Sequence, residues 1–460
     1  MQHQILTPMI RIFITILLAL MAGSAWCQNS IVGEVSTDYN RNSIIRNCNG
    51  SLVAYGEKLS GGGSLMLVGS PAANHTVPSI MLPQHVHIKD FTYYDSVIYF
   101  VGYQLILQDS MAIVGKVPMS DFGQAWANLT YSQLNPSYLF LQNGSLTNTH
   151  KCLWHLVAYP ILGKVHVVAV GENHEQASIS GRISGNHKYG VYDVVIGQPQ
   201  YKFAVSNEML FDLDIVDDYV VVAGRKGLLS DLSRPGYLVA WVMDKDADPV
   251  QSLMGRLGFN SDGYVYATGN VRIVRTEQSQ FALAYMVDDN GSEYFELSHW
   301  SLDPMGYIHP ICSQRCSYPY NTRPYYLCRD MLYNSASQSI CALSECDRHA
   351  GYTVFKADSH GDCLDIVSEF SHSRIKQQSL CGYANTSWAG CGTTSSNLLH
   401  VMVQEINGDE SCGQIYPAAS IGSIKGHSTW VDLPPQEAGQ STMQVGVPVI
   451  QVPYQTTCVK

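Results

Sequence analysis

The sequence predicts an all-β protein folded as a single β-propeller of about seven antiparallel blades, with six or eight blades as the fallback. Three observations support this: a recurring three-strand unit, strands of β-branched and aromatic residues separated by turn residues, and no long stretch of helical periodicity. The clearest unit spans residues 210–244, with strands LFDLDIV, YVVVAG and YLVAWVMD and a first turn at Asp217 and Asp218. Such a unit predicts one small antiparallel sheet.

A second copy of this unit spans residues 88–117, where aligning Gly102 with Gly224 places Asp90 on Asp212 without a gap. The spacing of the copies, roughly 45–70 residues, is somewhat longer than the ~40–50 residues of familiar propeller repeats. Weaker copies follow the same rhythm at 51–70, 164–184, 280–302, 338–358 and 398–417.

Two other all-β architectures are compatible with repeated strands: a string of sandwich domains and a long β-solenoid. The repeats are too short for sandwich domains of ~100 residues. A small sheet cannot bury both of its faces alone, whereas radial stacking of several sheets around an axis buries them and leaves only short edges. The propeller is therefore the preferred prediction.

The N-terminal residues 1–27 are expected to be a secretory signal peptide, and residues 28–460 a single propeller domain. Arg11 precedes the apolar run IFITILLALMA, and small residues follow, which places cleavage between Cys27 and Gln28. A lipoprotein anchor at Cys27 is the alternative, disfavoured by the bulky Trp26 before it. The run is well short of the ~20 residues that a membrane-spanning helix needs. We therefore expect an exported protein that is periplasmic, on the cell surface or secreted.

The composition restricts the partners of the chain. The formal net charge is −11, and charged residues make up only 14% of the sequence against 46% hydrophobic residues. Nucleic acids and anionic membrane surfaces both attract basic proteins, so neither is an expected partner.

The cysteines predict disulfides. The chain has 13 cysteines, and removal of Cys27 with the signal peptide leaves an even number in an exported protein. The expected local pair is Cys381 with Cys391, because glycines between them let the loop fold back. A metal site is not expected, because no CxxC pair is present. Most of the cysteines lie in the C-terminal half, which we expect to carry disulfide-rich loops: Cys312, Cys316, Cys328, Cys341, Cys346, Cys363, Cys381, Cys391, Cys412 and Cys458.

No signature of a catalytic site or of a cofactor is present: the sequence has no GxSxG, HExxH, Walker loop or Rossmann fingerprint. His85 and His87 share one face of a predicted strand, close to Asp90, as a metal site would require. No second histidine pair stands in the equivalent repeats, so two structural histidines are the preferred interpretation, and no metal or cofactor is expected.

Asp90 and Asp212 occupy the same place in two repeats. If their strand is the innermost of each blade, these acids line the central channel, where they bind a cation or sugar hydroxyls, or accept backbone N–H groups between blades. Repetition favours the structural role.

Two irregular loops are the expected ligand-binding surface: residues 309–329, rich in Pro, Tyr and Cys, and residues 371–396. Aromatic rings bind sugars or protein surfaces at low entropic cost, although such loops also plug channels or cover blade edges. The candidate ligand-binding residues are Tyr318, Tyr320, Tyr325, Tyr326, Tyr383 and Trp388.

The pattern I-x-D-φ followed by D-x-V-φ-Y-φ-x-G, at residues 88–102 and more loosely at 210–224, resembles exported β-propeller repeat proteins of gut-type Gram-negative (Bacteroidetes-like) bacteria. The signal sequence ending AWCQ is similar to signals in that group. The resemblance covers roughly residues 44–417. It implies a propeller in the envelope or outside the cell, and it brings no catalytic residues with it.

Two functions remain open. The first is a non-catalytic binding propeller that engages a glycan or a protein through one face. The second is a secreted polysaccharide hydrolase or lyase, which needs two positioned carboxylates at the channel mouth. Several acids within ~10 Å of one another in a deep axial pocket would favour the enzyme, and a shallow aromatic mouth would favour the binding protein.

Overall fold

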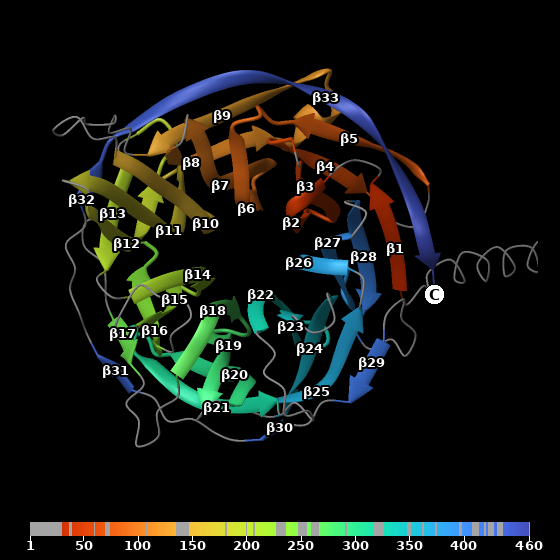
Figure 1. Cartoon of the computed structure of the whole chain (residues 1–460). Helices are drawn as coiled ribbons and strands as arrows, with labels where there is room; N and C mark the ends of the chain where they lie inside the picture. Colours follow the sequence, from red (N-terminus) through yellow and green to blue (C-terminus); the bar gives the residue numbers. More distant parts are fainter. Residues whose placement is uncertain are drawn as a thin grey trace, which may run out of the picture.

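The structure is a computed structural model of residues 1–460, drawn in Figure 1. It describes residues 30–35, 39–58, 60–69, 74–106, 109–134, 147–179, 182–198, 200–205, 208–226, 236–246, 255–258, 266–289, 292–316, 326–346, 351–360, 363–372, 375–394, 398–406, 414–417, 420–421, 427–429 and 436–459. The predicted signal peptide lies outside these residues and stays a prediction. Within the described ranges, no helix is long and apolar enough to cross a membrane.

The described strands pair in seven antiparallel blades. Figure 1 shows the blades arranged around a central axis. Each blade has four strands, here given from the axis outward. Blade 1 is β2 (Tyr39–Cys48), β3 (Ser51–Lys58), β4 (Gly63–Gly69) and β5 (His75–Met81); blade 2 is β6 (Val86–Tyr94), β7 (Val97–Ile106), β8 (Asp109–Pro118) and β9 (Trp126–Leu134); blade 3 is β10 (Thr147–Ile161), β11 (Lys164–Ile179), β12 (Arg182–Val194) and β13 (Gln200–Val205); blade 4 is β14 (Glu208–Val216), β15 (Tyr219–Lys226), β16 (Gly236–Asp244) and β17 (Gly255–Gly258). Blade 5 is β18 (Tyr266–Arg275), β19 (Gln280–Asp289), β20 (Ser292–Leu302) and β21 (Ile308–Cys316); blade 6 is β22 (Tyr326–Asn334), β23 (Ser339–Cys346), β24 (Gly351–His360) and β25 (Cys363–His372); blade 7 is β26 (Ile375–Tyr383), β27 (Ser387–Thr394), β28 (Leu399–Glu405) and the N-terminal β1 (Ser30–Val35).

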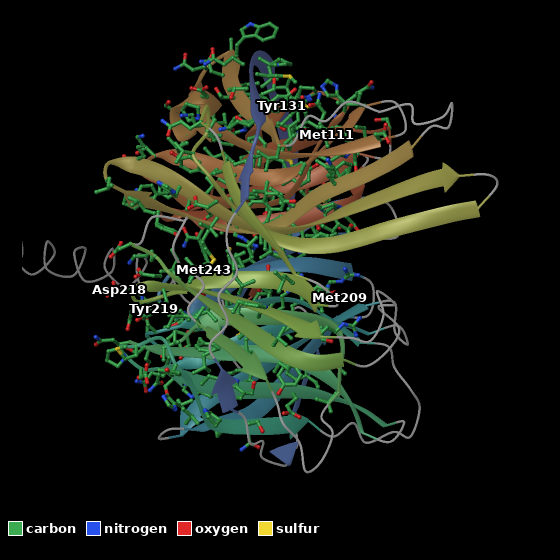
Figure 2. All side chains as sticks on the ribbon, turned by 90° about the vertical axis from the view of Figure 1, so that its left-hand side faces the viewer. Met111, Tyr131, Met209, Asp218, Tyr219 and Met243 are labelled. Atoms are coloured by element: carbon green, nitrogen blue, oxygen red, sulfur yellow. The ribbon has the colours of Figure 1, made fainter. Side chains whose placement is uncertain are left out.

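The prediction of an all-β propeller is confirmed. Six of the seven sequence units fall within blades 1 to 6, one in each blade, and the two clearest units are blades 2 and 4. The unit at 398–417 is wrong: its first half is β28 of blade 7, and its second half pairs with β25 of blade 6. The β11–β12 hairpin of blade 3 is longer than its counterparts and projects beyond the ring in the side view of Figure 2.

The two ends of the chain close the ring together. β1 pairs with β28, so the N-terminal strand is the fourth strand of blade 7, and β33 (Gln440–Val459) pairs with β1 from outside. The N-terminal and C-terminal strands therefore complete the outer edge of blade 7 together. Pro448 and Pro453 are tolerated in β33 because this strand is the outermost one, where a missing N–H leaves no inner neighbour unpaired.

The C-terminal segment does more than close blade 7. From residue 414 onward it runs around the outside of the ring and adds a fifth antiparallel strand to every blade, an arrangement here called the belt. β29 (Gln414–Pro417) pairs with blade 6, β30 (Ser420–Ile421) with blade 5, β31 (His427–Thr429) with blade 4 and β32 (Gln436–Ala438) with blade 3. β33 then pairs with blades 2, 1 and 7 in turn.

Hydrophobic side chains fill the space between blades rather than one central core. Six buried clusters connect every pair of neighbouring blades around the ring. The largest cluster joins blades 3, 4 and 5 around Trp241 and Trp300, whose side chains are 2% and 1% exposed. Each blade therefore buries both of its faces against its neighbours, as radial stacking requires.

Each innermost strand carries one interruption of its register with the second strand. The shift lies between Ile88 and Asp90 in blade 2, and the equivalent shifts in the other blades fall at 39/43, 153/155, 210/212, 268/272, 328/330 and 377/379. Gly102, Gly171 and Gly224 face this bulge in blades 2, 3 and 4, where a β-carbon would overlap a carbonyl oxygen of the first strand. Only glycine allows this close approach.

Tyr454 tests the contribution of the belt to stability. Its side chain is 2% exposed, belongs to the cluster between blades 7 and 1, and packs over Gly33 of β1. We expect Tyr454→Ala to lower the free energy of unfolding by about 3–5 kcal/mol, because it empties a buried aromatic site.

The neighbouring Gln455 is exposed on the same strand and provides the control. Gln455→Ala should change stability by less than about 0.5 kcal/mol. Urea denaturation followed by tryptophan fluorescence measures both variants, and equal midpoints for the two would contradict a packed belt.

Candidate functional site

The bulges of the innermost strands build a cavity on the axis of the ring. A residue within a bulge has no partner in the strand ladder, so its side chain is turned out of the regular alternation. Side chains from six of the bulges line the same cavity, which has a volume of about 410 Å³. These bulge residues are Asn42, Lys89, Trp154, Phe211, Asn270 and Arg329.

The first paired residue after each bulge points to the axis as well. These post-bulge residues are Ser43, Asp90, His155, Asp212, Arg272, Asp330 and Ser379, one from each blade. Five of them line the cavity, and Asp90 and Asp212 lie behind it, buried to 4% and 8% exposure. With Arg46 of β2 added, acids from blades 2, 4 and 6 alternate around the axis with bases from blades 1, 3 and 5.

Arg46 joins three blades. Its Nη2 donates to Asp90 Oδ1 at 2.7 Å, and its Nη1 donates to Asp330 Oδ2 at 2.9 Å and to Ser379 Oγ at 2.7 Å. Burial alone would lower the pKa of Arg46, but Asp330 and Asp90 raise it, so the guanidinium stays charged. Burial likewise pushes the pKa of Asp90 upward, but Arg46 and His155 lower it below its ordinary value.

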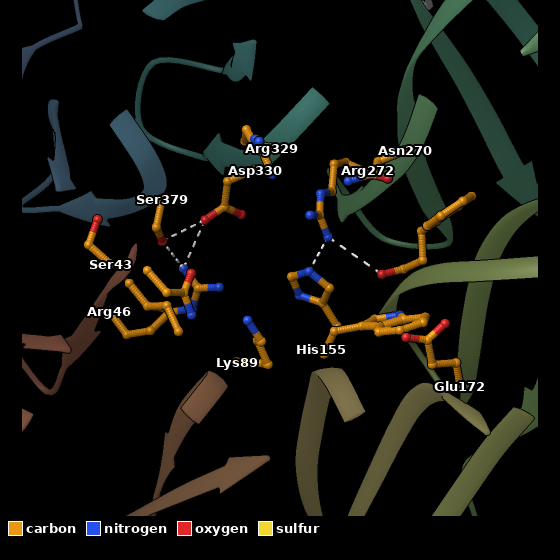
Figure 3. A pocket seen from close by; sticks show the side chains of 14 residues that line it. Ser43, Arg46, Lys89, His155, Glu172, Asn270, Arg272, Arg329, Asp330 and Ser379 are labelled. Carbon is orange, nitrogen blue, oxygen red and sulfur yellow. Dashed lines mark hydrogen bonds and ion pairs between the residues drawn. The ribbon is translucent and has the colours of Figure 1, made fainter. Parts of the chain in front are cut away.

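His155 holds the opposite side of the ring. Its Nδ1 lies 3.0 Å from Asp90 Oδ2 and 3.5 Å from Asp212 Oδ1, while its Nε2 accepts from Arg272 Nη1. An imidazole that accepts at Nε2 carries its proton on Nδ1, which is the nitrogen that faces both carboxylates. Burial raises the pKa of Asp212, and His155 and Arg272 offset only part of that effect. Both ring nitrogens of His155 are therefore engaged, and Figure 3 shows the contact with Arg272.

The acids of the ring also bind the backbone. In Asp90, Asp212 and Asp330, one oxygen accepts the N–H of the following residue at 2.8–3.0 Å. The second oxygen of Asp212 accepts Ile273 N–H of blade 5, and that of Asp330 accepts Leu380 N–H of blade 7. In all three acids, both carboxylate oxygens have partners. Their role is to connect neighbouring blades, which is the structural role that repetition favoured for Asp90 and Asp212.

The cavity itself is richer in positive charge than in negative charge. Arg46, Lys89, Arg272 and Arg329 line it, against the carboxylates of Glu172 and Asp330. Figure 3 shows Lys89 pointing into the space between Arg46 and His155. Trp154 lies half-buried at the wall, held by a 3.0 Å hydrogen bond from its Nε1 to the carbonyl oxygen of Leu210 in blade 4. The arrangement offers cations, amides and an aromatic wall to a ligand.

The predicted ligand-binding aromatics lie elsewhere. Tyr318, Tyr320 and Tyr325 lie outside the described residues, Tyr326 is the first residue of β22, and Tyr383 is half-buried at the end of β26. Trp388 is 3% exposed in the core between blades 6 and 7, so its ring packs in the hydrophobic core and is not available to bind a ligand at the surface.

Both expected loops are largely strands. Residues 309–316 belong to β21 and residues 326–329 to β22, while most of 371–396 forms the β26–β27 hairpin. The glycines of the sequence GYANTSWAGCG, which indicated a loop, lie in the turn and in the inner strands of blade 7.

The disulfide prediction is wrong for Cys381 and Cys391, which have free thiols. Cys391 faces Ser379 and Cys381 faces Ala389 across the ladder, so the two cysteines are diagonal neighbours. Diagonal neighbours lie ~7–8 Å apart, beyond the usual span of a disulfide. Burial raises the pKa of Cys391 to about 12, as expected for a thiol that acts as an apolar side chain. Free thiols are also found at Cys48, Cys152, Cys312, Cys328 and Cys341, whereas Cys458 is disulfide-bonded.

His85 and His87 do not share a site. His85 is exposed, whereas His87 is 2% exposed, stacks on Tyr103 with ring centroids 4.7 Å apart, and places Nδ1 3.2 Å from Glu57 Oε1. Its position is that of a packed core histidine between blades 1 and 2.

The sequence analysis missed His155, Arg272 and Ser379 because they are not acids like Asp90 and Asp212. It missed Asp330 because the unit recognised in blade 6 began only at residue 338. The recurring signal is a four-residue sequence pattern: an apolar residue, a large residue, a polar residue and a second apolar residue. It occurs in blades 2, 3, 4 and 6 as IKDF, LWHL, LFDL and CRDM, at residues 88–91, 153–156, 210–213 and 328–331. The large residue enters the bulge, and the polar residue joins the ring.

Comparisons with known proteins add little to the geometry. No protein-family model and no curated protein matches the sequence. Among solved structures, the chain is similar to the β-propeller domain of Nup133 from Vanderwaltozyma polyspora, with 9% sequence identity, a TM-score of 0.43, and coverage of 81% of this chain and 97% of that chain. So distant a likeness carries no argument about function; the propeller is read from the strand pairing itself.

Arg46 is expected to be needed for the closed ring. Arg46→Met leaves Asp90 and Asp330 buried without their shared cation, which typically costs about 3–5 kcal/mol. Arg275 and Asp217 form an ion pair at 3.0 Å whose side chains are 46% and 26% exposed, and Arg275→Met should cost no more than about 1 kcal/mol. Urea unfolding of both variants at neutral pH checks this contrast, and an Arg46 variant as stable as the Arg275 variant would refute it.

Asp214 gives the propeller a dependence on pH. Burial raises its pKa to about 6, although its carboxylate accepts the N–H groups of Arg275 and Ile215. An acid whose folded pKa lies above its unfolded value of 3.8 stabilises the fold at low pH, and this contribution is lost as the pH rises through about 6. We therefore compare the free energy of unfolding of wild type with that of Asp214→Asn. The value for wild type minus the value for the variant should be smaller at pH 7.5 than at pH 4.5. A difference that is constant with pH would contradict the assignment.

Proposed function

We propose that this protein is an exported, non-catalytic binding propeller that takes part of a glycan ligand into its axial cavity. The observation that carries the proposal is the cavity, to which all seven blades contribute and in which bulge residues offer aromatic, amide and cationic groups. Its volume of about 410 Å³ lies within the range of ~300–1,000 Å³ for small-molecule sites. Export rests on the N-terminal signal sequence, and it agrees with an extracellular glycan as ligand.

A glycan is favoured over a protein partner by the shape of the site. Protein partners usually bury ~1,200–2,000 Å² over a broad surface. This site is instead a concave cavity that is surrounded by the blades. The combination of an aromatic wall with amide groups suits sugar rings, which present apolar faces and polar rims. Trp154, Asn42 and Asn270 supply these groups here.

The carboxylates that a hydrolase or lyase needs are present near the axis, but their oxygens are already bonded within the protein. Asp90, Asp212 and Asp330 meet around the axis through Arg46 and His155, as such an enzyme would require. Each of them already uses both oxygens for cations, hydroxyls or backbone N–H groups. A general acid or nucleophile needs an oxygen directed at the substrate, so the bonding of these acids supports binding without catalysis.

Trp154 and Trp126 provide a matched pair of variants. Trp154 lines the cavity, whereas Trp126 is 63% exposed at the start of β9, away from the lining residues. On a glycan array probed with protein beginning at Gln28, Trp154→Ala should weaken binding to the best ligand about tenfold or more, because stacking contributes on the order of 1.4 kcal/mol or more. Trp126→Ala should bind as wild type does.

A reducing-sugar assay on the bound glycans separates the two functions. Binding without release of reducing ends supports the proposal, whereas release that depends on Asp330 or Asp212 would favour the enzyme. Equal loss of binding in both tryptophan variants, or binding unaffected by either, would place the site outside the cavity. Thermal unfolding of both variants confirms that each is folded.

A further inference from the structure

The cations that line the cavity differ in their described contacts. Arg46 and Arg272 contact carboxylates of the ring, at 2.7 Å to Asp90 and at 3.9 Å to Asp212. Lys89 has no carboxylate within ion-pair distance among the described residues. Its described contact is with the ring of Tyr103, whose centroid lies 5.5 Å from Nζ.

The acid nearest to Lys89 along the chain is already occupied. Asp90 follows directly in the sequence, but its two oxygens bind Arg46, His155 and the N–H of Phe91. The bulge separates the two neighbours: Asp90 turns behind the cavity wall, and Lys89 turns into the cavity. Lys89 is half-buried, so an ammonium group is held at the wall with part of its hydration removed.

Arg329 holds the equivalent bulge position in blade 6. It is the bulge residue before Asp330, it lines the same cavity, and its neighbour Asp330 is bound by Arg46, Ser379 and two backbone N–H groups. Two of the six lining bulge residues are thus cations, whereas none is an acid. The net charge of the chain is −11, so the excess of cations in the lining of this cavity runs against the overall charge of the chain.

We propose that the cavity recognises an acidic sugar, a glycan unit that carries a carboxylate, with Lys89 and Arg329 as the groups that bind the carboxylate and Trp154 against the sugar ring. This inference rests on the proposed function and adds the class of ligand to it. A guanidinium binds a carboxylate through two parallel N–H groups, and an ammonium adds a point charge from the other side. Glu172, at the cavity wall in blade 3, disfavours a second negative charge on the ligand.

The test uses matched ligands that differ only in charge. Oligosaccharides that end in galacturonic, glucuronic or N-acetylneuraminic acid are compared with their methyl esters by titration calorimetry. We expect at least one acid to bind about tenfold or more tightly than its ester, because a hydrogen bond to a charged group contributes on the order of 1.5–3 kcal/mol. Raising the salt concentration should weaken binding of the acid more than binding of the ester.

Variants assign the preference to these two residues. Lys89→Met and Arg329→Met should each move the ratio of acid affinity to ester affinity toward one, and Lys89→Arg should retain the preference because it keeps the charge. Lys116, on the third strand of the same blade and not among the lining residues, is the control, and Lys116→Met should keep the wild-type ratio. Thermal unfolding of each variant checks that it is folded.

The outcomes separate this inference from the function on which it rests. If esters bind as tightly as acids in every pair that binds, the acidic class is overturned while glycan binding stands. If no saccharide binds, both proposals fail. If an acid is preferred but Lys89→Met and Arg329→Met leave the ratio unchanged, the carboxylate site lies elsewhere and the assignment of these residues is wrong.

Discussion

The ring depends on one local irregularity, a β-bulge in the innermost strand of each blade. The bulge turns two successive side chains toward the axis, which a regular strand cannot do because its side chains alternate between faces. The second of the two makes the bonds that hold neighbouring blades: Asp212 to Ile273 N–H, Asp330 to Leu380 N–H, and Arg46 between Asp90 and Asp330. The blades approach the axis closely there, so buried charges are tolerated only as alternating, fully bonded partners.

Closure at the rim uses a different interaction, the backbone pairing of the belt. A hydrophobic cluster and the hydrogen bond from Arg46 to Ser379 join blade 7 to blade 1, and β1 and β33 connect these blades by backbone pairing as well. The belt pairs with every blade, and β33 alone spans blades 2, 1 and 7, so the ring cannot open between these three blades without breaking pairs of β33. Except for the pairing of β29 with β25, the pairings of the belt join residues that lie far apart in the sequence, such as Val35 and Tyr454. Such non-local contacts form late because loop closure must precede them. We infer that the blades fold before the belt strands pair with them.

The sequence revealed the repeat through its β-branched strands and turn acids, because blades 2 and 4 keep both features at the same spacing. It also placed Asp90 and Asp212 at an equivalent position. It did not reveal His155, Arg272 and Ser379, because the ring needs complementary partners and so varies its chemistry from blade to blade. The short belt strands, such as Ser420–Ile421, are joined to the blades by backbone groups that leave no side-chain pattern. Cys381 and Cys391 indicated a disulfide by their spacing, yet the strand register places them diagonally.

The two residues of each bulge carry different constraints, and this separation explains how a stable ring can hold a variable site. The post-bulge residues must match their neighbours in the adjacent blades, because a change in one leaves a buried charge without its partner. The bulge residues have no ladder partner, and Lys89 and Trp154 reach the cavity while Asp90 and His155 hold the ring. Replacing a bulge residue therefore changes what the cavity binds at little cost to the connections between blades. The chemistry of the ligand is set by those few side chains, and the fold sets only where they meet.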